Sequence, residues 1–193
     1  MSRRRTARPL RRRRAIRAPR ASVLSGAGAA PVHEGERTLA NTQQMMQEWL
    51  RHRRVLPELL AGLNDEQIGF KPWDGAMTLG KLALHIAGST DAFVSFAKTG
   101  EFARPSVPEC RTADDVRRTV DELTAKTQAT YASLSDADLE VERDASHMGL
   151  KGPAKMFLSA ARDHEVHHKG QLFVYVRMAG AEKVPFFVSV ARG

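Results

Sequence analysis

The stretch PAKMFLSAARDHEVHHKGQLFVYVRM, residues 153–178, decides the fold. Apolar side chains recur through it every three or four residues, and this period predicts one long amphipathic helix. Pro153 suits the first turn of that helix, and Gly180 is its expected C-terminal stop. A helix of this length needs other helices to cover its apolar stripe, so the stretch predicts a helical bundle.

The apolar stripe of this helix carries two histidines. At 100° per residue, His164 and His168 lie about 40° apart on the helical wheel, in the middle of the stripe. His167 lies at the edge of the stripe, and Lys169 points outward. Two imidazoles at i, i+4 converge over one helical turn and can chelate a divalent ion when a neighbouring helix supplies a third ligand.

Three further helices are predicted upstream. They are expected at about residues 36–62, at about residues 79–99, and from Thr112 through an apolar stripe that reaches Leu134. Pro57 should kink or split the first helix near Leu56, and Thr78 and Thr112 are good N-caps for the second and third. Residues 135–151 show no clear pattern, and residues 185–190 could add a short extended end. We therefore predict an all-α, up-down four-helix bundle.

The third metal ligand is expected from the second helix. His85 stands there among apolar neighbours, and a site with two ligands from one helix and one from another is typical of bundle interiors. A histidine pair alone is more often hydrogen-bonded or exposed than metallated, but placing imidazoles in an apolar stripe is costly without a partner, which favours a metal. His33 and His52 lack such a setting. His147 is a distant candidate for a fourth ligand.

The positive charge of the chain is concentrated at its N-terminus. The net charge is +8, but residues 1–33 contain ten arginines and no acid (+10), whereas residues 34–193 hold 20 Lys+Arg and 22 Asp+Glu (−2). This division confines any nucleic-acid binding to the tail. We predict a disordered basic extension over residues 1–35 and a bundle domain over residues 36–193. An organellar transit peptide, a twin-arginine export signal, a nucleic-acid-binding arm and a true start near Met45 or Met46 stay open as alternatives.

The cysteine count and hydropathy narrow the class of protein further. Cys110 is the only cysteine, which excludes an intrachain disulfide and a Cys-based structural zinc site. The count fits a reducing compartment, so we expect a cytoplasmic protein. No stretch reaches the roughly 18 apolar residues of a membrane span, and we expect no membrane partner.

Several motifs together resemble one known family, the DinB/YfiT-like superfamily, which is distinct from the translesion polymerase that shares the name. The resemblance runs over roughly residues 38–187 and rests on Phe70-Lys-Pro72, Thr78-Leu-Gly-Lys-Leu-Ala-Leu-His85-Ile86, His164-x-x-x-His168-Lys-Gly-Gln171, Tyr175-x-Arg177-x-x-Gly180 and Val184-Pro185.

The resemblance implies a four-helix bundle, often homodimeric, with a divalent metal, commonly zinc or nickel, held by three histidines. By motif position these are His85, His164 and His168, the three that the helical wheel selects. Lys169 stands where the family usually has arginine. Characterised relatives include thiol-dependent S-transferases, a mycothiol-dependent isomerase and metal-dependent hydrolases, so the expected partners are a small-molecule substrate and a low-molecular-weight thiol.

Two hypotheses of function follow. The first is a metal-dependent enzyme, either a hydrolase acting through metal-bound water or an S-transferase acting through a bound thiolate. The second is a non-catalytic metal-binding bundle, with or without a tail that contacts nucleic acid. Gln171 is expected to satisfy an imidazole, and neither Glu165 nor Cys110 is assigned a catalytic role. Val166 and Phe173 lie opposite the histidine stripe, which favours a second partner, either another element of the same chain such as residues 185–190 or another subunit.

Overall fold

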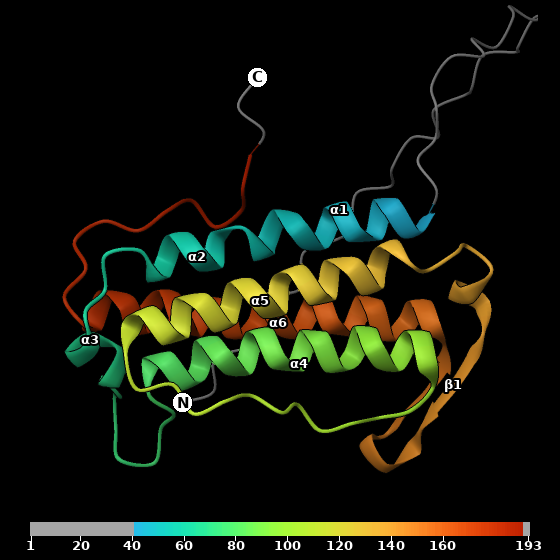
Figure 1. The fold of residues 1–193 in the computed structure, drawn as a ribbon, viewed down its shortest axis with the longest axis horizontal. Helices are drawn as coiled ribbons and strands as arrows, with labels where there is room; N and C mark the ends of the chain where they lie inside the picture. The colour runs from blue at the N-terminus through green and yellow to red at the C-terminus, as the bar shows by residue number, and fades with distance from the viewer. Residues whose placement is uncertain (1–40, 191–193) are drawn as a thin grey trace, which may run out of the picture. The chain divides into compact units, whose positions relative to one another are not determined.

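The computed structural model describes residues 41–190, and most of them are helical (Figure 1). The α-helices are α1 (Asn41–Arg53), α2 (Val55–Leu60), α3 (Asp65–Gly69), α4 (Leu79–Thr99), α5 (Ala113–Ala132) and α6 (Ala154–Met178), with 3-10 turns η1 (Asp138–Glu140) and η2 (Ser146–Met148) and strands β1 (Glu142–Ala145) and β2 (Leu150–Pro153). The predicted extension over residues 1–35 and the domain boundary after it lie outside the described residues.

The first predicted helix is two helices. α1 ends at Arg53 and α2 begins at Val55, so Pro57 lies in the first turn of α2, where its missing N–H breaks no helical hydrogen bond. Proline has no N–H to donate and its ring crowds the preceding turn, so the predicted split near Leu56 is confirmed. The expected start at residue 36 lies outside the described residues.

The starts of α4 and α5 and the end of α4 follow their capping residues. The Thr78 and Thr112 hydroxyls accept hydrogen bonds from the backbone N–H three residues on, and Asp115 completes a capping box with Thr112. Gly100 ends α4 with a φ of 77°, a left-handed conformation that costs glycine little. These boundaries confirm the predicted second and third helices.

The helices do not alternate in direction, so the predicted up-down order is wrong. Lys98 near the end of α4 donates to the carbonyl of Ser133 at the end of α5, and the Lys126 ammonium in α5 pairs with Asp91 midway along α4. These two helices are therefore parallel. α6 runs the opposite way, because Thr90 of α4 meets Glu165 in the middle of α6 while Phe96 meets Phe157 near its start. α1 runs in the same direction as α6, because Glu48 pairs with Arg162 and His52 lies beside Lys169 further along both helices.

The connection between α4 and α5 makes the parallel pair possible. It runs back along the whole length of α4 (Figure 1). α4 has 21 residues, which span about 31 Å, and the eleven residues 101–111 can reach about 36 Å when extended. Pro105 and Pro108 favour that extended course. We call residues 101–111 the crossover segment.

A small hairpin corrects the all-α prediction. β1 and β2 pair antiparallel across the stretch that showed no clear pattern, with Gly149 in the turn at a φ of 74°. The Arg143 guanidinium donates to the carbonyls of Ala97 and Lys98, which leaves the hairpin fastened to the C-terminal end of α4. Those carbonyls have no partner within the helix, and arginine satisfies them.

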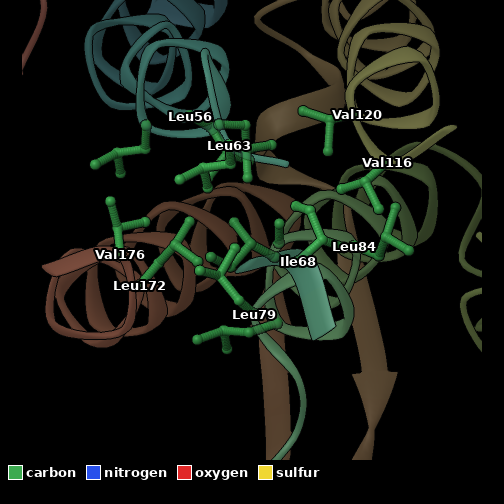
Figure 2. Packing of buried hydrophobic residues seen from close by; sticks show 14 of the residues in the cluster. Leu56, Leu63, Ile68, Leu79, Leu84, Val116, Val120, Leu172 and Val176 are labelled. Atoms are coloured by element: carbon green, nitrogen blue, oxygen red, sulfur yellow. The ribbon is translucent and has the colours of Figure 1, made fainter. Parts of the chain in front are cut away.

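The apolar core consists of two clusters. One lies where α2, α3 and the first turns of α4 and α5 meet the last turns of α6, and Figure 2 shows Leu56, Ile68, Val116 and Leu172 converging there. The other joins α1, the ends of α4 and α5, the hairpin and the start of α6. The middle of α6, near residue 165, belongs to neither, and a polar layer fills that level of the molecule.

The segment after α6 returns over α2 towards α1 (Figure 1). Near its end the N–H of Ser189 donates to the carbonyl of Arg51 and Val188 is buried. No strand forms over residues 185–190, so the short extended end considered there is not found. Within residues 41–190, no helix combines the length and the apolar character needed to cross a bilayer.

Candidate metal centre

Three histidines meet where α4 crosses α6 in the polar layer. His85 comes from the second turn of α4, and His164 and His168 lie one turn apart on α6. The ring centroids are 5.1 Å apart for His85–His164, 4.7 Å for His85–His168 and 4.4 Å for His164–His168. Each ring offers one nitrogen, and these three nitrogens all lie within 4.8 Å of one another. The structure thus brings together the three residues that the sequence selects.

The spacing of two of the rings matches metal coordination. The Nε2 atoms of His85 and His168 are 3.3 Å apart. Two imidazole nitrogens that bind one tetrahedral zinc at about 2.0–2.1 Å are about 3.3–3.4 Å apart. A direct N–H···N hydrogen bond between two neutral rings has a similar length, so the distance suits either a shared proton or a shared cation.

Gln171 fixes the chemical form of one ring. Its Oε1 lies 2.7 Å from Nδ1 of His168, and an amide oxygen only accepts, so Nδ1 carries the hydrogen. The lone pair of His168 is then on Nε2, the atom that faces His85. The amide nitrogen of Gln171 approaches His167 at 3.4 Å, which agrees with this orientation of the amide. The predicted role of Gln171, satisfying an imidazole, is confirmed.

Two of the three rings, those of His164 and His85, favour their neutral forms. Burial lowers the pKa of His164 to about 4, and repulsion from the neighbouring His168 and His85 adds to the effect. Burial, and then the charge of His168, also lowers the pKa of His85. Neutral imidazole is the form that binds a metal, so these shifts keep lone pairs available at neutral pH.

His164 has an unmet hydrogen-bonding group. Among the described residues, its Nδ1 is the one buried side-chain nitrogen or oxygen without a partner. Leaving such a group unpaired costs about 1–3 kcal/mol. A cation bound through this atom would remove that cost, and the donor set of three neutral imidazoles is one that zinc and nickel accept.

A second polar cluster on α6 is fully satisfied, and sequence reasoning missed it. The carboxylate of Glu165 accepts hydrogen bonds from Nε and Nη2 of Arg53, the indole N–H of Trp49 and the hydroxyl of Thr90. Both charged side chains are 0% exposed. Arg53 lies one helical turn after Trp49, so it falls on the same apolar stripe of α1. A charged residue on an apolar stripe indicates a buried ion pair, and this was the signal that the sequence offered.

The outward position predicted for Lys169 is wrong. Lys169 is buried, and its Nζ donates to the carbonyl of Phe187 at 2.7 Å and lies 3.0 Å from Nδ1 of His52. Burial lowers the pKa of Lys169 to about 8. The wheel assumed that α6 is covered on one side, whereas α1 and the segment after α6 cover a second side.

The remaining candidates lie apart from the three rings. His147 is exposed in η2, with its ring 5.6 Å from that of Phe102 beyond the end of α4, and His167 is exposed at the rim. Cys110 is half-buried in the crossover segment and contacts the hydroxyl of Thr119. His33 lies outside the described residues.

A cavity of about 830 Å³ opens beside the three rings. Of the three histidines, only His85 lines it, together with Ser89, whose hydroxyl lies 3.4 Å from Nδ1 of His85. The opposite wall is the crossover segment, including Val107 and Cys110. A space of this size accommodates a small organic ligand.

Comparisons with known proteins agree with this architecture. The sequence profile of the DinB family matches residues 38–190. YjoA of Bacillus subtilis (strain 168) is 31% identical over 150 residues, which are 77% of this chain and 97% of YjoA. Its crystal structure superposes with a TM-score of 0.66 at 32% identity, covering 75% of this chain and 97% of that one.

Two further solved structures are similar. A DinB-like protein from Bacillus cereus ATCC 10987 gives a TM-score of 0.64 at 25% identity and covers 75% of this chain and 95% of its own. A mycothiol-dependent maleylpyruvate isomerase gives 0.55 at 15% identity, with 68% of this chain and 60% of that chain covered. The last likeness shows a shared fold alone.

Proposed function

The chain belongs to the DinB family, and from that premise we propose that it is a divalent-metal-dependent enzyme, a thiol-dependent S-transferase or a hydrolase. The observation that carries the proposal is the convergence of three imidazoles, each of which offers one ring nitrogen, with these nitrogens all within 4.8 Å of one another. His85, His164 and His168 would hold the ion, zinc or nickel. A metal bound by three neutral ligands lowers the pKa of a bound water or holds a thiolate as a nucleophile.

Neighbouring side chains already hold two of the proposed ligand rings in fixed orientations. Gln171 holds the ring of His168 with its Nε2 lone pair directed towards His85. Ser89 contacts the other nitrogen of His85, so that ring also has a fixed orientation. The adjoining cavity gives a small molecule access to one edge of the site.

Two findings support the choice of chemistry. Among the described residues no acid joins the three rings, because the adjacent carboxylate of Glu165 is committed to Arg53, Trp49 and Thr90. The site therefore suits reactions in which the metal activates the nucleophile and no carboxylate is needed as a general base. A structural neighbour that is mycothiol-dependent by name supports a thiol as co-substrate.

Metal content of untagged protein tests the site. Wild-type protein should retain about one equivalent of zinc or nickel after dialysis, and His85→Ala, His164→Ala and His168→Ala should each lose most of it, because each removes one of three ligands. His167→Ala is the matched control, since this exposed ring is a neighbour on the same helix. Stoichiometric metal in a His164→Ala/His168→Ala double variant would refute the site.

Turnover separates the two classes of function. Metal-loaded wild-type protein would be assayed with low-molecular-weight thiols plus electrophiles, and separately with ester and amide substrates. Activity that disappears in His85→Ala and persists in His167→Ala supports an enzyme. Stoichiometric metal with no turnover in either assay favours a non-catalytic metal-binding protein instead.

We also propose that the protein forms a homodimer through the outer face of α6. Val166, Val174 and Met178 are exposed there, at 40%, 53% and 54%. Phe173 contributes less than its wheel position predicts, because it packs partly against the core and the Arg177 guanidinium lies 5.7 Å from its ring centre. Sedimentation should give a dimer at tens of micromolar, and Val174→Glu should dissociate it without changing its metal content. A wild-type monomer would refute the dimer.

A further inference from the structure

We propose that the cavity beside His85 binds a small anion with an apolar body, and that Lys81 and Arg104 recognise its charged group. This inference rests on the proposed function, since it names the substrate class of that same site. The cavity has walls from α4 on one side and the crossover segment on the other, so a ligand in it would contact both.

The apolar part of the cavity has a rigid wall. Leu84, Ile68 and Val107 line it, and the first two are buried in the core. The crossover segment presses against α4 at Gly88, where an added Cβ would lie 2.7 Å from Cγ2 of Val107. Real side chains do not approach so closely, so glycine at this position lets the wall sit where it does.

The charged groups of the cavity are not all free. Asp65 accepts a hydrogen bond from the N–H of Ala113 at the start of α5, and Glu109 pairs with Arg111 at 3.8 Å. By contrast, neither Lys81 nor Arg104 makes an ion pair or a side-chain hydrogen bond within residues 41–190. The backbone N–H does not cancel the charge of Asp65, so the three cations Lys81, Arg104 and Arg111 against two carboxylates leave one excess positive charge in the cavity.

The position of Lys81 directs a ligand towards the metal centre. Lys81 and His85 are at i, i+4 on α4 and both line the cavity, so their side chains are neighbours about 6 Å apart at Cβ. Arg104 lines the same cavity from the crossover segment. An anion held between Lys81 and Arg104 would place the rest of a ligand along the apolar wall, within one helical turn of His85.

A pair of fluorescent dyes tests the charge requirement. 8-Anilinonaphthalene-1-sulfonate carries a sulfonate, and N-phenyl-1-naphthylamine has the same ring system without it. The anionic dye should bind wild-type full-length protein more tightly, and Lys81→Ala/Arg104→Ala should weaken it about tenfold while leaving the neutral dye unchanged. Arg54→Ala, which removes an exposed cation outside the cavity, is the control for net charge.

Cys110 reports where the dye binds, because it lines the cavity and is the only cysteine in the chain. Saturating anionic dye should slow the alkylation of wild-type Cys110 by N-ethylmaleimide several-fold. Unchanged alkylation would place the dye elsewhere and overturn the proposal. So would a double variant that binds the anionic dye like wild type, or one that loses both dyes equally.

Metal analysis of the same samples separates the two proposals. Lys81→Ala/Arg104→Ala should keep the metal content of wild type, because neither residue is a candidate ligand, and both side chains are exposed enough to be replaced without unfolding the protein. Loss of dye discrimination with metal retained would overturn the cavity inference alone. Wild-type protein that binds no metal but still discriminates the dyes would refute the metal enzyme and leave the anion site standing.

Discussion

Two polar clusters share the middle of α6, and they differ in how completely their atoms are paired. Around Glu165, both charges are buried and the carboxylate accepts four hydrogen bonds. Around His164, the residue before it, a buried nitrogen has no partner and three rings face one another. The first cluster is closed and needs nothing from solution, whereas the second has donor atoms to offer.

The closed cluster orients the open one. Arg53 and Trp49 come from α1 and Thr90 from α4, so Glu165 ties α6 to two neighbouring helices. These bonds fix the rotation of α6 about its axis. His164 and His168 consequently face His85 whether or not a ligand is present, which is the preorganisation that a binding site needs.

The largest effect should come from breaking the closed cluster. Glu165→Ala leaves the guanidinium of Arg53 buried without its counter-charge, and such a loss costs about 3–5 kcal/mol. Chemical denaturation should show this drop in the free energy of unfolding. An Arg53→Met/Glu165→Leu double variant should recover most of it, because both charges are then removed together. A drop of less than 1 kcal/mol in Glu165→Ala would show that the cluster does not secure the fold.

The next effect should come from filling the open cluster. Zinc that binds the folded protein alone stabilises it, by about 2.7 kcal/mol at a free concentration 100 times its dissociation constant. The midpoint of thermal unfolding should rise with zinc in wild-type protein and in His167→Ala, but not in His85→Ala. An equal rise in His85→Ala would mean that zinc acts elsewhere.

A smaller effect should follow when the support of one ring is removed. Gln171→Leu takes away the acceptor that holds Nδ1 of His168. Losing such a partner behind a ligating histidine weakens metal binding by about 10- to 100-fold. Calorimetric titration with zinc measures this change, and Gln171→Glu, which keeps an acceptor, should restore most of the affinity. Unaltered affinity in Gln171→Leu would show that the ring needs no such support.

The open cluster was easier to predict from sequence than the closed one. His164 and His168 can be recognised in the sequence, because their spacing matches one helical turn and a recurrent family motif. Glu165 lay off the centre of the same stripe and its partner Arg53 lies 112 positions away, so no local pattern joins them. Lys169 was misplaced for a related reason, since one helical wheel cannot show how many neighbours cover a helix.

The fold divides in the same way between local and long-range information. Caps at Thr78 and Thr112 and the split before Pro57 were predictable, because each depends on residues within one turn. Helix direction depends on whether a connection doubles back, and the length of residues 101–111 permits either course. The prolines of the crossover segment favoured the extended one. The hairpin lacked a period of two because its strands have only four residues each.

The smallest predicted effect concerns acid and separates the clusters without a metal. The pKa of His164 is lowered to about 4 in the folded protein, against 6.5 when exposed, and that of His85 is also lowered. Below pH 6.5 the unfolded chain therefore binds protons that the folded one refuses, so the stability that these neutral rings contribute above pH 6.5 is lost as pH falls towards 4. After allowance for the part of each ring that water reaches, metal-free protein should lose about 1–2 kcal/mol of its free energy of unfolding in this window.

His164→Leu should lose less free energy of unfolding, because leucine has no group that accepts a proton in either state. Denaturant titrations at pH 7 and pH 4.5 measure the difference. Equal losses in the two proteins would show that His164 is not held neutral, and the open cluster would then be no better prepared for a cation than an exposed histidine pair.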